Sequence, residues 1–230
     1  MDWIALQLAD ASFPTGGFAH SGGLEAALQA GALEGLGALA HFLDDALWQA
    51  GRLTLPFVGA AHDSGQMGLA ARGTWPSAFL ALDVAHDAAL RSPVANRASR
   101  SQGRAHLDAC VRAFGGRALR ELRGAARAAR SPRHLAPVLG ASLGVLGVAR
   151  DDALQLHLHA TARCVVSAAV RLGIAGPGEA QRLQASCAST LRAVLAECGE
   201  LEPAAQCQTA PLLDLLGAGH DRLYSRLFTS

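Results

Sequence analysis

The densest group of residues able to do chemistry is near the N-terminus, in the run Phe13-Pro-Thr-Gly-Gly-Phe-Ala-His-Ser-Gly-Gly-Leu-Glu. Glycine-rich loops bind phosphate through backbone N–H groups when a lysine and then a serine or threonine follow the last glycine. The sequence contains no lysine, which also excludes a Schiff-base lysine or a lysine phosphate clamp. We expect a shaped loop, with Ser21 capping a helix through Leu24 to Leu28. An ordinary connector is the less favoured alternative, because two phenylalanines and a histidine flank the glycines.

Nine histidines could supply metal ligands, but their spacing argues against a site within one chain. His157 and His159 are two residues apart, which places them about 200° apart around a helix and prevents both from binding one metal. The other histidines are scattered, so a metal site would have to be assembled by the fold or between subunits. We therefore predict no metal site here and expect both residues to be helix surface or core histidines.

The sequence also lacks the structural context of nucleophilic enzymes. The spacing G-x-S-x-G occurs at Gly140 to Gly144, but the helix-rich pattern offers no strand to make it a nucleophile elbow, and no papain-like cysteine context occurs. The five cysteines are odd in number and never spaced C-x-x-C, which argues against a disulfide framework or a zinc knuckle. Free cysteines fit a reducing cytoplasm.

Two surfaces could bind another protein. Arg120, Arg123, Arg127 and Arg130 advance by three or four residues and form a basic stripe along a helix. A solvated face is the favoured interpretation, and docking on an acidic partner is the alternative. The C-terminal tail combines aromatic, basic and apolar residues of the kind enriched at interfaces, so we predict a docking tail over residues 218–230 and not a frayed end.

Composition limits the classes of function further. The formal net charge is +1 and aromatic residues make up 5%, so neither nucleic acid nor an anionic membrane is an expected partner. The N-terminus lacks the basic start of a signal peptide. The longest uncharged apolar stretch, Leu135 to Ala149, is shorter than the roughly 18 residues of a membrane span, so we expect a buried helix in a soluble protein.

The elements that must position these residues are predicted to be helices. Alanine and leucine dominate, and apolar residues recur at helical spacing, which indicates an all-α fold of roughly eight to ten helices in a single domain over 1–230. One amphipathic stripe begins at Leu36 and is predicted to stop at Gly51. Further helices are expected to start at Pro76, at Pro177, and at Asp151 or Asp152, whose carboxylate could cap the segment that follows.

Four blocks of the sequence together resemble the urease accessory protein UreF family. They are Leu6 to Glu25, Arg97 to Gly103, Ser167 to Gly173, and His220 to Ser230. The likeness spans nearly the whole chain. It departs from the family at Leu223, where a glutamine is common, and after Gly176, where Pro177 replaces another common glutamine.

The resemblance implies an all-α, dimeric, cytoplasmic protein without enzymatic activity. Such a protein would be a scaffold that bridges UreD/UreH and the GTPase UreG for nickel insertion into apo-urease, with no cofactor bound by this chain alone. The resemblance makes the following residues candidates for partner binding: Phe13, Pro14, Gly16, Gly17, Phe18, His20, Glu25, Arg97, Arg100, Gln102, His220, Tyr224, Arg226, Leu227 and Phe228. Two alternatives stay open: a regulator of GTP hydrolysis by UreG, with Arg100 as the arginine finger, and an unrelated small helical enzyme that uses a histidine.

Overall fold

The computed structural model describes residues 2–70 and 75–230, and within these ranges it contains helices and no strand. The α-helices are α1 (Trp3–Ala9), α2 (Leu24–Gln29), α3 (Gly35–Gln49), α4 (Leu55–Ala70), α5 (Trp75–Ala89), α6 (Pro93–Ala113), α7 (Arg117–Ala128), α8 (Leu135–Val145), α9 (Arg150–Arg171), α10 (Pro177–Ser186), α11 (Ala188–Cys198) and α12 (Pro211–Ala218). Short turns of other helix types are η1 (Gly17–Ala19), η2 (Ala50–Thr54), η3 (Pro203–Ala205) and η4 (Gly219–Arg222). The predicted all-α fold is confirmed.

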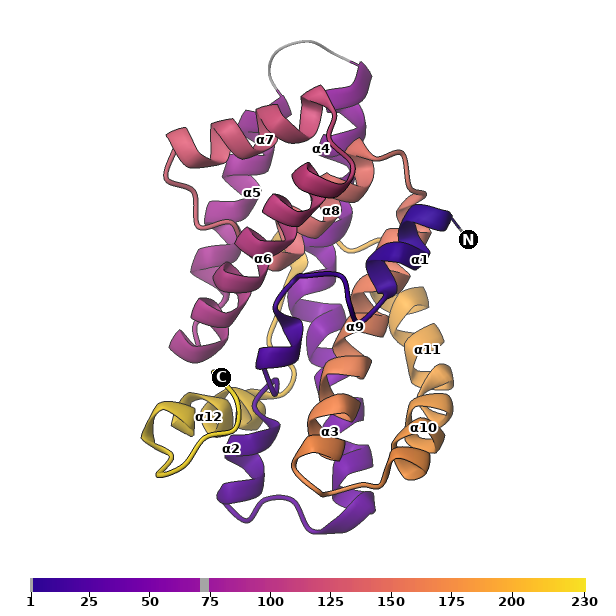
Figure 1. The fold of residues 1–230 in the computed structure, drawn as a ribbon, viewed down its shortest axis with the longest axis vertical. Coiled ribbons are helices and arrows are strands. Elements are labelled where there is room, and N and C mark those ends of the chain that lie inside the picture. Colours follow the sequence, from indigo (N-terminus) through magenta and orange to yellow (C-terminus); the bar gives the residue numbers. More distant parts are fainter. Residues whose placement is uncertain (1, 71–74) are drawn as a thin grey trace.

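The helices surround α8, which is the most deeply buried of those described. Every residue of α8 from Ala136 to Val145 is buried, which confirms the buried helix expected in this apolar stretch. Helix α8 packs against α4 so closely that a Cβ at Gly140 or Gly144 would overlap the carbonyl oxygens of Val58 and His62. These glycines therefore bring two helix backbones into direct contact, at the centre of the upper half of Figure 1.

The amphipathic stripe that starts near Leu36 does not end at Gly51, so that prediction is wrong. Helix α3 continues through the π-helical turn η2 into α4, and the three form one long rod (Figure 1). A Cβ at Gly51 would overlap the side chain of Val194 on α11. The glycine is present because another helix approaches closely and not because the helix stops there.

The predicted helix starts are close to those observed. Helix α10 begins at Pro177 as predicted, and α5 begins at Trp75, one residue before Pro76. Helix α9 begins at Arg150, and its N-cap residue Ala149 offers no side chain for capping. The predicted carboxylate cap is thus wrong: both aspartates lie inside the first turn, where they favour the helix through its dipole.

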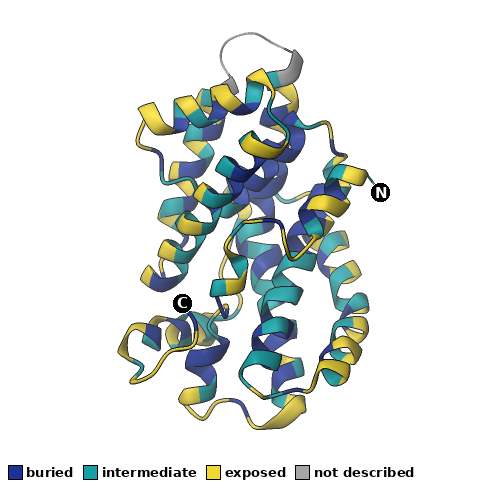
Figure 2. Cartoon of the chain, viewed as in Figure 1, coloured by how far each residue is buried: buried dark blue, intermediate teal, exposed yellow. Residues whose placement is uncertain are grey.

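Helix α9 links the apolar core. Its first turns contribute Leu154 and Leu156, and its later turns contribute Val165 and Val166, to core clusters that reach from the α4–α8 contact to α2 and α3. Figure 2 shows this buried strip along α9, with exposed residues on the outer faces of α7, α10 and α12. None of the described helices combines the length and the apolar character needed to cross a membrane.

Candidate functional site

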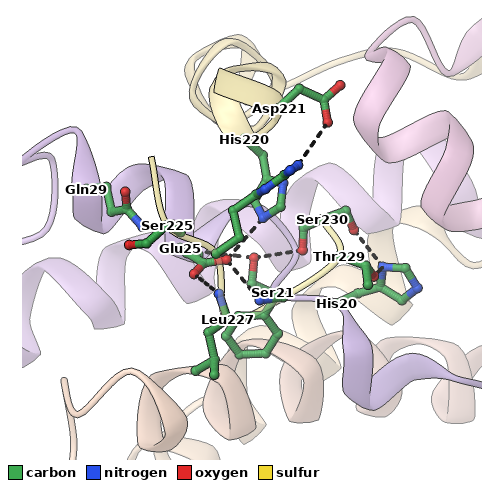
Figure 3. A network of polar contacts seen from close by, with 12 residues as sticks. His20, Ser21, Glu25, Gln29, His220, Asp221, Ser225, Leu227, Thr229 and Ser230 are labelled. Atoms are coloured by element: carbon green, nitrogen blue, oxygen red, sulfur yellow. Dashed lines mark hydrogen bonds and ion pairs between the residues drawn. The ribbon is translucent and has the colours of Figure 1, made fainter. Parts of the chain in front are cut away.

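The C-terminal tail lies along the glycine-rich segment that follows α1, and we call the place where residues 13–29 contact residues 218–230 the terminal junction (Figures 1 and 3). The backbone N–H of Ser21 donates to the main-chain oxygen of Ser230 at 2.7 Å, and the N–H of Thr229 donates to the carbonyl of Ala19 at 2.8 Å. The Ser21 hydroxyl donates to the same Ser230 oxygen at 3.0 Å. The tail is therefore held along the glycine-rich loop by main-chain bonds.

Glu25 is the centre of the junction. Its side chain is 2% exposed, and its carboxylate accepts hydrogen bonds from the backbone N–H of Leu227 at 2.6 Å and of Phe228 at 3.2 Å. The imidazole Nε2 of His220 lies 3.0 Å from the same carboxylate. Glu25 is in the first turn of α2, where the helix dipole also favours a negative charge. One buried carboxylate therefore fixes both the start of the tail and its distal part.

Local sequence explains how Glu25 reaches this place. Gly22 and Gly23 both adopt positive φ values, 63° and 89°, which turn the chain from the loop into α2. The N-cap residue of α2 is Gly23, so the prediction that Ser21 caps this helix is wrong. The Ser21 hydroxyl does accept a hydrogen bond from the N–H of Glu25 in the first turn, at 3.4 Å. The observed helix, Leu24–Gln29, is one residue longer than predicted.

His20 forms another buried polar contact of the junction. Its Nδ1 lies 2.6 Å from the hydroxyl of Ser230. Its backbone carbonyl accepts a hydrogen bond of 3.4 Å from the thiol of Cys164 on α9. Burial lowers the pKa of His20 below the usual 6.5, and the nearby imidazole of His220 lowers this pKa further. His20 is therefore neutral near pH 7 and acts as a hydrogen-bonding group.

Arg171 joins the loop, the tail and α9. Its guanidinium carbon lies 3.8 Å from the ring centroid of Phe18 and 4.1 Å from that of Phe228, and it also donates to the carbonyl of Phe18. A cation between two aromatic rings contributes about 0.5–2 kcal/mol per contact. Sequence reasoning did not select Arg171 as a site residue, although it lies in the block Ser167 to Gly173, because the pairing depends on two rings 210 residues apart in the chain.

The first residues of the loop cover a cavity. Phe13 is buried and contacts the rings of His106 and Phe114, with centroid distances of 5.9 and 6.2 Å. A cavity of about 420 Å³ lies beneath the loop, between α6, α9 and the tail. The predicted site residues that line it are Phe13, Pro14, Gly16, Gly17, Phe18, His20, Gln102 and Phe228. The fold thus brings half of the N-terminal block and one residue of the middle block to one place.

The two arginines of the middle block are used differently. Arg97 donates twice to the Asp221 carboxylate, at 2.7 and 2.8 Å, and Arg226 lies 4.0 Å from the same carboxylate. Arg97 therefore ties α6 to the tail. Arg100 instead lies 3.9 Å from Asp87, on the side of α6 that faces α5, so it is not part of the terminal junction.

The predicted partner-binding residues divide by exposure. Tyr224 is fully exposed, Phe18 is 69% exposed and Leu227 is 53% exposed, so these apolar side chains face solvent beside the junction. In contrast, Glu25, His220 and Phe228 are buried within the chain. The buried residues hold the tail against the rest of the chain. A partner that contacted them directly would first have to displace the tail. Partner binding by all of these residues stays a prediction.

The structure also brings together a serine, a histidine and an aspartate that the sequence leaves far apart. His134 Nδ1 lies 3.1 Å from the Ser99 hydroxyl, and its Nε2 lies 2.9 Å from Asp87. The Ser99 hydroxyl, however, accepts the N–H of Leu135 at 3.2 Å and so holds the first turn of α8. Burial lowers the pKa of His134, against the opposing effect of Asp87. We interpret the trio as a structural bridge between α5, α6 and α8.

Buried histidines elsewhere are neutral as well. Burial lowers the pKa of His106 and of His157 to about 4, and His157 Nε2 lies 2.7 Å from the hydroxyl of Thr54 in the π-helical turn. The prediction that His157 is a helical core histidine is confirmed, and His159 on the same helix is half-buried. Within residues 2–70 and 75–230, no group of three or more His, Cys, Asp or Glu side chains is arranged to hold a metal ion.

Fold and site together describe an all-helical protein whose characteristic site holds its own tail and presents apolar side chains beside it. Comparison with known proteins specifies the class. A family model described as UreF matches residues 34–188. The chain is 36% identical to urease accessory protein F of Arabidopsis thaliana, over 100% of this chain and 93% of that protein. It is 34% identical to urease accessory protein UreF of Mycobacterium tuberculosis, over 99% of this chain and 98% of that protein.

The chain therefore belongs to the UreF family of urease accessory proteins. It is an accessory protein and not an enzyme, so the alternative of an unrelated histidine-dependent enzyme is wrong. The terminal junction lies outside the residues that the family model matches, but inside the alignment with the Arabidopsis relative, which covers the whole chain.

Proposed function

We propose that this protein is a scaffold in urease maturation that bridges UreD/UreH and the GTPase UreG during nickel insertion into apo-urease. We further propose that it acts as a homodimer in the cytoplasm and binds no cofactor by itself. Family membership supports a role in urease maturation. The bridging role draws its support from the terminal junction, which holds an otherwise extended tail in a fixed position beside solvent-facing apolar residues.

The tail is the part of this surface that we assign to UreD/UreH. Tyr224 and Leu227 face solvent, whereas the residues between and after them are tied to Glu25 and Gln29. Exposed aromatic and aliphatic side chains on a fixed backbone lose little conformational entropy on binding, which makes them good interface anchors. This exposed pair on a fixed tail is the observation that carries the assignment.

The experiment is co-purification of the full chain with UreD/UreH and UreG. We expect the parent protein to capture both, and the double variant Tyr224→Ala/Leu227→Ala to lose UreD/UreH. The matched control is Leu36→Ala/Met67→Ala, which removes exposed apolar side chains elsewhere on the molecule. Failure of the parent to bind both proteins would contradict the scaffold, and full binding by the tail variant would contradict the tail assignment alone.

A further inference from the structure

Half of the positive charge of the chain is concentrated on α6, α7 and the loop that follows. Residues 97–133 contain ten of the twenty arginines and only two of the nineteen acidic residues. This segment therefore carries a net charge of +8, whereas the rest of the chain carries −7. Figure 1 shows α7 at one end of the molecule and α6 running from beneath it toward the middle, and Figure 2 shows that the outer side of α7 is exposed.

Four of these arginines lie near one another, and two of them contact the carboxylate of Asp108. Arg127 donates to Asp108 at 3.1 Å, and Arg123 lies 3.6 Å from it. Burial lowers the pKa of Arg133, and the nearby guanidinium groups of Arg104 and Arg127 lower it further. The group, which we call the arginine cluster, consists of Arg104, Arg123, Arg127 and Arg133. Its four guanidinium groups outnumber the two nearby carboxylates, Asp108 and Asp83.

The position of Arg133 is built into the fold. Its φ is +61° and that of Arg130 is +51°, values that L-residues with side chains rarely adopt. The fully buried carboxylate of Asp83 holds the backbone at residues 133 and 134. It accepts hydrogen bonds from the N–H of Arg133 at 2.6 Å and from the N–H of His134 at 2.8 Å. Opposite, a Cβ at Gly103 would overlap the Arg133 carbonyl, so the loop lies directly on α6.

The guanidinium of Arg133 is also incompletely satisfied. Its Nε is buried and has no hydrogen-bond partner among the described residues. A buried unpaired donor on a charged group is destabilising, because its lost hydration is not replaced. A bound anion would compensate this unpaired guanidinium donor.

We propose that the arginine cluster binds carboxylate side chains of an acidic segment on a partner protein. Arginine pairs with carboxylates through two parallel hydrogen bonds, and the cluster supplies four guanidinium groups against two neighbouring carboxylates, Asp108 and Asp83. Nucleic acid fits less well, because none of the exposed large apolar or aromatic side chains of the described residues lies between 97 and 133, and bases would have nothing to stack on. Contacts of this kind are electrostatic and weaken as salt screens them.

The test measures binding of the full chain to a fluorescein-labelled twelve-residue peptide of alternating glutamate and serine. Binding is measured by fluorescence anisotropy at low salt. We expect saturable binding that weakens about tenfold in Arg104→Gln/Arg127→Gln, since two close charge pairs are lost. The matched control, Arg182→Gln/Arg192→Gln, removes the same charge from exposed arginines on α10 and α11 and should bind like the parent.

A third variant distinguishes an effect on binding from a folding defect. Asp108→Asn removes the carboxylate that neutralises the cluster, so it should tighten peptide binding by about threefold, which misfolding would not do. No saturable binding, equal weakening by both double variants, or tighter binding of a twelve-base-pair DNA duplex than of the peptide would overturn the proposal. None of these outcomes bears on the scaffold function, because neither UreD/UreH nor UreG takes part.

Discussion

At the residue scale, Glu25 is the side chain on which the terminal junction depends most. Replacing it with alanine leaves two backbone N–H groups and the His220 imidazole without an acceptor. We expect Glu25→Ala to lower the free energy of unfolding by about 3 kcal/mol, the cost of breaking a buried charged network by removing one partner. Denaturant titration measures this, and hydrogen exchange at Leu227 and Phe228 should show the tail amides becoming unprotected.

The matched control for this prediction is Glu34→Ala. Glu34 is exposed and makes no capping hydrogen bond at the start of α3. It should therefore change stability by less than about 0.5 kcal/mol. Equal effects of the two variants, or unchanged exchange at the tail amides in Glu25→Ala, would show that the carboxylate does not hold the tail.

The lowered pKa values of the buried histidines should make the stability of the fold depend on pH. A histidine in the unfolded chain titrates near pH 6.5, whereas burial lowers the pKa of His106 and of His157 to about 4 in the fold. Between these values the unfolded state binds protons that the native state does not. The free energy of unfolding should therefore fall as pH falls from 6.5 to 4, by up to about 1.4 kcal/mol per pH unit for each histidine.

Urea titrations at pH 7.5, 6 and 5 measure this slope. His157→Gln keeps a polar group near Thr54 and removes the titrating imidazole, so the slope should become shallower. The control is His41→Gln, which removes an exposed histidine and should leave the slope closer to that of the parent. A parent protein whose stability did not decline in acid would contradict the assignment of neutral buried histidines.

At the element scale, the glycines of α8 set the distance between two helices. Gly140→Ala would drive a methyl group into the Val58 carbonyl of α4, and the backbones would have to move apart. We expect a loss of about 2–3 kcal/mol in the free energy of unfolding, as for other overpacked cores. Thermal and urea denaturation measure it.

Gly124→Ala provides the opposite control. Gly124 lies inside α7, and a Cβ there would contact nothing within 4 Å. Alanine favours a helix over glycine by up to about 1 kcal/mol, so this variant should be more stable than the parent. If both substitutions changed stability in the same direction, the close approach of α4 and α8 would not be the reason for Gly140.

At the scale of the whole molecule, the single domain predicted for residues 1–230 remains to be tested. Nine of the described helices have ten or more residues, in agreement with the rough count from the sequence. Because α9 contributes to all three core clusters, we expect one cooperative transition in urea. Far-UV circular dichroism and tryptophan fluorescence should give coincident midpoints, and separate midpoints would indicate two domains.

By itself, the sequence determined the helical class and the locations of most helices, because apolar periodicity and alanine-rich composition are local properties. It also showed that the glycine-rich segment 13–25 and the tail 218–230 have uncommon composition, and it indicated the family that they resemble. Gly51 shows the limit of local reasoning: a glycine at the end of a stripe is typical of a helix stop, and only the approach of Val194 from α11 reveals its actual role.

Only the tertiary structure decided how the two ends are used. Glu25 and His220 are 195 residues apart, and no local pattern records that one carboxylate accepts both the imidazole and the tail amides. The same holds for the contact of Arg171 with two phenylalanine rings. It also holds for the hydrogen bond from the Arg133 backbone to Asp83. Such contacts depend on how helices pack over long distances, which a single sequence does not specify residue by residue.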